Sequence, residues 1–386
     1  MTKVLANGAL LVALIGGSIT PALAQTSSTE SFEDLARRAG SVLDSRPSEA
    51  AELYQRALAI RPDWAEGWMS LGGALYQLNR CAEATDAFRK GIKLAPGIGN
   101  AWAFLGLCEA ELDDPDQALA DIRKGEALGL HGNWQFEVAV RVRAAQLLMK
   151  ASSFDEAPEQ LLPLALRQED SAVIEQTMGL AALGLGAAFP ELPPEKRAVV
   201  ALAGKAAWAL ASERPAEAAE AYEQLLARYP DEPGVHYAYG LYLTETNVVA
   251  AFAEFQKEAQ NNPKHWPSLI MIGSLRIRQG EPEPAIQSLR QALKYVPAKH
   301  RWLCHVELGR AILMSGNLDV ATTEFETAAR LLPSNPQVHL FLAQVYRRAG
   351  RTEDARRQAA EFENLKAQQD PAGLPGLRPF ASSAGK

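Results

Sequence analysis

The stretch "WMSLGGALYQLNRCAEATDAFRKGIKLAP", residues 68–96, carries the spacing that decides the fold. Its first part has apolar or small residues at i, i+3, i+4 and i+7, which is one face of a helix: Trp68, Leu71, Gly72 and Leu75. After a turn at 78–80, a second helical face carries Ala84, Phe88 and Ile92 and ends at Pro96. The stretch therefore predicts two antiparallel helices, which approach closely where Gly72 and Ala84 are small.

The same spacing returns along the chain. The next copy, 34 residues later, has Trp102, Leu105, Gly106 and Ala118. Toward the C-terminus the pattern comes back around Gly273, around Gly309 with Phe325 and Pro333, and around Ala343. A fixed period of this length indicates stacked helical hairpins, because one hairpin cannot bury its apolar face alone.

These residues and their period resemble the tetratricopeptide repeat over about residues 31–369. The resemblance implies an all-α fold, an α-solenoid in which stacked helix-turn-helix hairpins form a right-handed superhelix. It also implies that Trp68, Gly72, Ala84, Phe88 and their equivalents pack the core.

The N-terminus has the pattern of a cleaved secretory signal at residues 1–24. Lys3 precedes an apolar run, and Ala22 and Ala24 stand as A-x-A before Gln25. An uncleaved anchor helix is the alternative. No later apolar run reaches the length of a membrane span. We therefore expect an exported protein, periplasmic or secreted.

Composition divides the rest of the chain. A flexible tail at 25–30 precedes an N-terminal repeat array at 31–183, and "GLGAAFPELPPEKR" interrupts the period within 184–198. This break is either a surface insertion or a hinge or binding loop. A C-terminal array with a terminal capping helix follows at 199–369, and a Pro/Gly-rich disordered tail at 370–386.

No motif of an enzyme is present. The sequence has no Gly-rich phosphate-binding loop, since Leu71–Gly73 lies inside a predicted helix. It also has no G-x-S-x-G, HExxH or CxxC motif. We therefore predict no catalytic residue, no metal and no cofactor. The net charge of -7 argues against nucleic acid as a partner.

Three cysteines, Cys81, Cys108 and Cys304, allow one disulfide in an exported chain. Cys81 opens the second helix of one repeat and Cys108 lies late in the first helix of the next, so antiparallel packing favours a Cys81–Cys108 bond. The alternative is that both are small buried apolar residues, as we expect for Cys304.

The resemblance places certain positions of each first helix on a concave groove, which binds peptides or proteins in this family. In the N-terminal array these positions include Met69, Tyr76 and Asn100. The family's chaperone-binding members hold a peptide carboxylate with Lys and Asn, but Met69 and Gly73 stand at those places here. That clamp is therefore not expected.

The C-terminal array has arginines at groove positions: Arg278, Arg310, Arg347 and Arg348. Guanidinium groups pair with carboxylates, so these residues favour an acidic or C-terminal peptide. Alternatively, they neutralise helix C-terminal dipoles.

We therefore predict a non-catalytic scaffold or adaptor that binds a peptide or protein partner. The alternative is a periplasmic accessory module for polysaccharide or protein secretion that contacts glycan, with Tyr76, Tyr237 and Trp266 as stacking surfaces. The sequence specifies neither one partner nor an oligomeric state.

Overall fold

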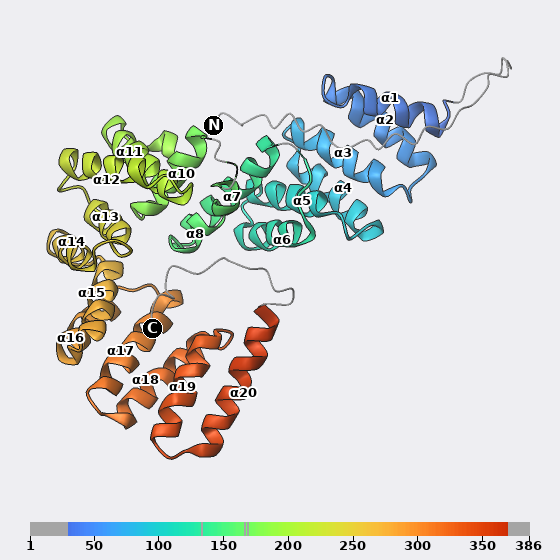
Figure 1. Cartoon of the computed structure of the whole chain (residues 1–386). Helices are drawn as coiled ribbons and strands as arrows, with labels where there is room; N and C mark the ends of the chain where they lie inside the picture. The colour runs from blue at the N-terminus through green and yellow to red at the C-terminus, as the bar shows by residue number, and fades with distance from the viewer. Residues whose placement is uncertain (1–29, 133, 166, 168–169, 370–386) are drawn as a thin grey trace. The chain divides into compact units, whose positions relative to one another are not determined.

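The computed structural model describes residues 30–132, 134–165, 167 and 170–369. Within these residues it is built from α-helices, two short 3-10 turns and no strand, which confirms the all-α prediction (Figure 1). The predicted signal peptide and C-terminal tail lie outside the described residues. The contacts divide the chain into two compact units, which meet between Ala227 and Arg228.

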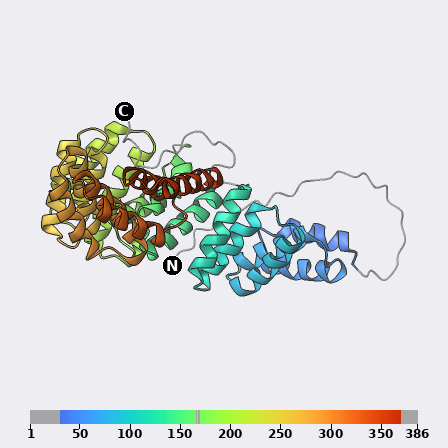
Figure 2. The ribbon, with the colours of Figure 1, turned by 90° about the horizontal axis from the view of Figure 1, so that it is seen from below.

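Unit 1 consists of consecutive helices that pack in pairs (Figure 2). They are α1 (Phe32–Val42), α2 (Pro47–Ile60), α3 (Ala65–Gln77), α4 (Cys81–Leu94), α5 (Gly99–Glu111), α6 (Pro115–Leu128), α7 (Trp134–Lys150), α8 (Glu156–Glu159), α9 (Leu162–Ala165), α10 (Ala172–Ala182), η1 (Phe189–Glu191), α11 (Pro194–Ala211) and α12 (Pro215–Arg228). The Pro/Gly-rich break at 184–198 lies inside this unit, where it forms a turn, η1 and the start of α11.

Unit 2 repeats the same arrangement with four hairpins. They are α13 (Val235–Leu243) with α14 (Val248–Asn261), α15 (Trp266–Gln279) with α16 (Pro282–Leu293), α17 (Arg301–Met314) with α18 (Leu318–Leu331), and α19 (Pro336–Arg348) with α20 (Thr352–Gln369). The turn η2 (Ala298–His300) precedes α17. Each second helix also packs on the first helix of the following hairpin. The buried apolar side chains form two clusters, and α15 contributes residues to both.

In several hairpins a glycine of the first helix accommodates a ring or branched side chain of the second helix. A Cβ on Gly72 would lie 2.8 Å from the ring of Phe88, and a Cβ on Gly309 would lie 2.7 Å from the ring of Phe325. Both distances are well below van der Waals contact. A mid-helix glycine costs about 1 kcal/mol relative to alanine, and the close helix packing offsets that cost.

In several hairpins a Trp or His near the start of the first helix forms a hydrogen bond with the proline that follows the preceding hairpin. The ring N–H donates to the proline carbonyl in three pairs: Trp68–Pro62 at 2.8 Å, Trp102–Pro96 at 2.9 Å and His339–Pro333 at 2.7 Å. Because a carbonyl only accepts, His339 Nε2 carries the proton in the third pair. Tryptophan in the repeat signature thus has a polar function as well as an apolar one.

No helix of the described part of the chain combines the length and apolar character that a membrane span requires.

Candidate partner-binding surface

The predicted N-terminal groove residues mostly serve the packing of unit 1. Met69 is only 6% exposed and lies against Gly91, where an added Cβ would come within 2.9 Å of its side chain. The structure therefore places Met69 in the core rather than on an open groove, because a following helix covers it. The prediction that Met69 faces a partner has no support in this packing.

Tyr76 and Asn100 are also engaged within the unit. The ring of Tyr76 meets the ring of Phe104 edge-on at 5.4 Å, and burial raises the pKa of its hydroxyl to about 12. The Asn100 side chain bonds both backbone groups of His131: Oδ1 accepts from the N–H at 2.8 Å, and Nδ2 donates to the carbonyl. Asn100 thus ties the chain that follows α6 to α5.

In unit 2 the four predicted arginines differ in their surroundings. Arg310 is half-buried, and its Nη1 lies 2.7 and 2.9 Å from the two carboxylate oxygens of Glu307, a buried residue on the same helix. Its guanidinium also lies 5.8 Å from the centre of the Phe341 ring on α19. The charge of Arg310 is therefore balanced inside the protein, and the side chain is held in place.

Arg278, Arg347 and Arg348 are exposed, and none has a carboxylate partner among the described residues. They lie in the last turns of α15 and α19, where a cation also interacts favourably with the helix dipole. Between them, at the end of α17, Met314 is 46% exposed. The C-terminal ends of these first helices thus present unpaired positive charge beside an exposed apolar side chain.

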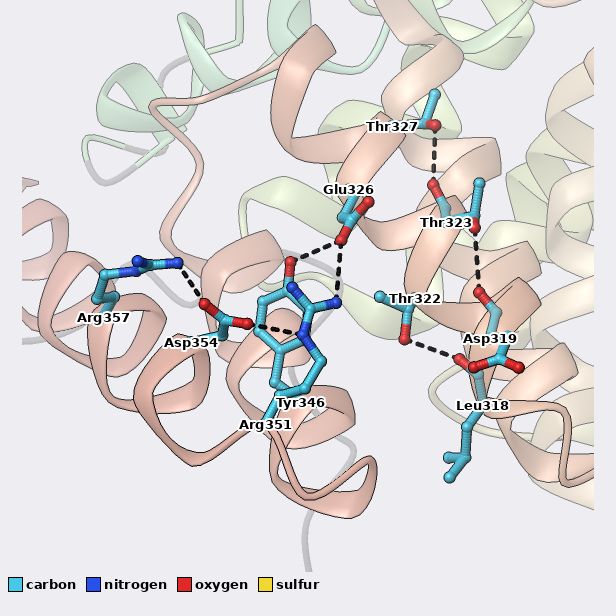
Figure 3. A network of polar contacts seen from close by, with 10 residues as sticks. All are labelled: Leu318, Asp319, Thr322, Thr323, Glu326, Thr327, Tyr346, Arg351, Asp354 and Arg357. Carbon is cyan, nitrogen blue, oxygen red and sulfur yellow. Dashed lines mark hydrogen bonds and ion pairs between the residues drawn. The ribbon is translucent and has the colours of Figure 1, made fainter.

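A polar network anchors α19 to its neighbours (Figure 3). The Tyr346 hydroxyl donates to Glu326 Oε1 on α18 at 2.7 Å, and the Arg351 guanidinium lies 4.1 Å from the centre of the Tyr346 ring. Arg351 Nε donates to Asp354 Oδ2 on α20 at 2.6 Å. Because Tyr346 faces α18, the next two residues of the helix are turned away from it and into solvent.

The aromatic residues considered for glycan stacking pack against neighbouring rings instead. Tyr237 lies edge-on to His265 at 4.9 Å and contacts Phe255 at 5.7 Å. Trp266 is stacked on His300 at 5.3 Å. Each of these rings, like Tyr76, thus has at least one neighbouring ring as a packing partner.

The three cysteines are buried. Cys81 and Cys108 both lie close enough to Tyr76 for their charges to affect the pKa of its hydroxyl, which places the two thiols in one region of the core. No disulfide joins them in the described residues, and the predicted bond stays a prediction. Burial raises the pKa of the Cys304 thiol to about 12, so it is a poor nucleophile.

No group of three or more His, Cys, Asp or Glu residues within the described ranges could hold a metal ion. An open hollow of about 660 Å³ is lined by residues of α16 and by the two residues that follow it, Lys294 and Tyr295. With walls from one helix and its end, it has no enclosed floor for a small molecule.

Comparison with known families agrees with this architecture. A tetratricopeptide repeat profile matches residues 44–97, 204–265 and 306–361, and a second tetratricopeptide repeat profile matches residues 267–298. The chain belongs to the tetratricopeptide repeat family, as the sequence predicts. No curated protein matches the chain.

Solved structures with a similar fold include MamA from Desulfovibrio magneticus RS-1 and Tom70 from yeast. The MamA structure is 19% identical, with a TM-score of 0.40, over 45% of this chain and 97% of its own. The Tom70 structure is 14% identical, with a TM-score of 0.39, over 87% of this chain and 76% of its own.

Proposed function

We propose that the protein is a non-catalytic scaffold, and that unit 2 binds a peptide or protein segment across the first helices of its hairpins. The observation that carries this proposal is the set of exposed side chains at the ends of α15, α17 and α19, where three arginines have no ion pair among the described residues. Tetratricopeptide repeat proteins bind protein partners through such surfaces. We also propose, from residues 1–24, that binding takes place outside the cytoplasm.

Site-specific photocrosslinking in the organism of origin tests this proposal. A photoreactive amino acid at Met314 lies on the proposed surface, whereas the same amino acid at Gln287 lies on the exposed side of the second helix α16. We expect one dominant protein adduct from position 314 and none from position 287. Adducts of equal yield from both positions, or from neither, would contradict a partner site on the first helices.

A further inference from the structure

The ends of three successive first helices form a row of equivalent positions. The small residues Gly273, Gly309 and Ala343 mark the same point of each hairpin, where the second helix crosses. The residues five positions later are Arg278, Met314 and Arg348, which we call the Arg–Met–Arg row. All three are exposed, and the two arginines have no ion pair among the described residues.

We propose that this row binds an extended acidic segment of a partner protein, with an apolar residue between two carboxylates. This inference rests on the proposed scaffold function and specifies its partner. The outer positions supply guanidinium groups, which pair with carboxylates. The middle position supplies Met314, a flexible apolar side chain suited to an apolar residue of the partner.

Arg310, on the middle first helix α17, does not provide a third site for a carboxylate of the partner. Arg310 already pairs with both oxygens of Glu307 at 2.7 and 2.9 Å. A carboxylate arriving there would have to displace an internal carboxylate from a partly buried pair, which is costly. The structure therefore favours an apolar residue over an acidic one at the middle of the segment.

The spacing of the helices sets the spacing of the ligand. Helices in direct contact, as α15 and α17 are, lie about 8–10 Å apart, whereas an extended chain rises about 3.3 Å per residue. We take the same step from α17 to α19, because α18 packs between them as α16 packs between α15 and α17. One hairpin step thus corresponds to about three ligand residues. The expected segment reads acidic at i, apolar at i+3 and acidic at i+6, with Arg347 close to the second acid.

The test uses a synthetic nonapeptide, Gly-Glu-Ser-Gly-Leu-Ser-Gly-Glu-Gly, and the full chain labelled on its methionine methyl groups. Titration followed by methyl NMR reads Met314 directly, and buried methionines such as Met69 serve as internal references. We expect a saturable shift of the Met314 methyl signal. Replacing both Glu residues of the peptide by Gln should weaken binding about tenfold, because two exposed ion pairs are lost.

A double variant, Arg278→Glu with Arg348→Glu, should weaken binding of the acidic peptide by about tenfold or more at low salt. The matched control is Arg290→Glu, an exposed arginine on α16, which should leave the affinity within about twofold. Circular dichroism of each variant shows whether the fold is kept.

The outcomes separate this inference from the function on which it rests. If the Gln peptide binds as tightly as the Glu peptide and shifts Met314, the acidic preference is wrong while the scaffold surface stands. The preference is also wrong if Arg290→Glu weakens binding as much as the double variant, or if a single-stranded oligonucleotide binds the row more tightly than the peptide. If a photoreactive amino acid at position 314 gives no protein adduct, the scaffold function itself is refuted.

Discussion

A buried pair of carboxyl groups between α5 and α6 predicts that this hairpin loses stability as the pH rises. Glu109 on α5 is 3% exposed and Asp121 on α6 is 5% exposed. Glu109 Oε1 accepts from Arg89 Nη2 at 3.0 Å, whereas its Oε2 is buried without a hydrogen-bond partner in the described structure. Asp121 Oδ1 accepts from Gln117 at 3.0 Å.

Burial raises the pKa of the Glu109 carboxyl from 4.5 to about 7, and the neighbouring Asp121 adds to this effect against the influence of Arg89. The folded chain thus holds a proton that the unfolded chain releases at lower pH. The corresponding stability is fully present below about pH 4.5 and is lost as the pH rises through about 7.

The variant Glu109→Gln keeps the side chain neutral at every pH. Each pKa unit corresponds to 1.36 kcal/mol, so the shift from 4.5 to about 7 sets an upper limit of about 3 kcal/mol. We expect the variant to exceed the wild type in stability by 1 to about 3 kcal/mol at pH 8, and to differ by less than about 1 kcal/mol at pH 5.

Hydrogen exchange of the α5 and α6 amides is the appropriate assay, because repeat proteins open locally and a single global transition is not assured. Protection factors, corrected for intrinsic exchange, give the local free energy at each pH. Glu83→Gln is the matched control, since Glu83 is exposed and pairs with Arg80 on the surface of α4. The reasoning fails if Glu109→Gln gives the same difference at pH 5 and pH 8, or if it destabilises the hairpin at pH 8.

Four further predictions concern the packing of the helices, a disulfide bond and the processing of the N-terminus. Gly204→Ala should destabilise unit 1 by about 1–3 kcal/mol in urea melts, since its Cβ would lie 1.8 Å from a backbone oxygen of α10. Gly73→Ala, with open space around the new methyl, should leave stability equal or higher; a larger loss than in the first variant would refute this packing argument. Mass spectrometry of unreduced peptides from the native host should show Cys81 joined to Cys108, and recovery of both as alkylated thiols would exclude the bond. N-terminal sequencing should begin at Gln25, whereas a chain that retains Lys3 would rule out cleavage.

The repeat pattern predicts the hairpins well because their contacts are local and recur with the period. Gly72 against Phe88 and Gly309 against Phe325 are both readable from spacing alone. The surface is less predictable. The position of a residue within its repeat predicts which face of the helix it lies on, but not which side chains of the neighbouring hairpin cover that face.

Particular residues show this limit. Met69 occupies a groove position, yet the packing of unit 1 covers it. Arg310 also occupies a groove position, but it forms an ion pair with Glu307, which lies one turn earlier on the same helix. The i, i+3 spacing of Glu307 and Arg310 is visible in the sequence and could have indicated the pair. The buried Glu109–Asp121 contact joins separate helices, and no local pattern signals it.

The hydrogen bonds between a ring nitrogen and a proline carbonyl also influence where unit 2 bends when a mechanical force acts on it. His339 braces the joint before α19 through the carbonyl of Pro333, whereas Leu269 stands at the corresponding place of α15 and offers no donor. At the α14–α15 joint the carbonyl of Pro263 accepts instead from Gln291 Nε2 on α16, at the longer distance of 3.4 Å. Because a longer hydrogen bond is weaker, that joint is the more compliant of the two. Tension transmitted through a bound partner would therefore strain the α14–α15 joint before the α18–α19 joint.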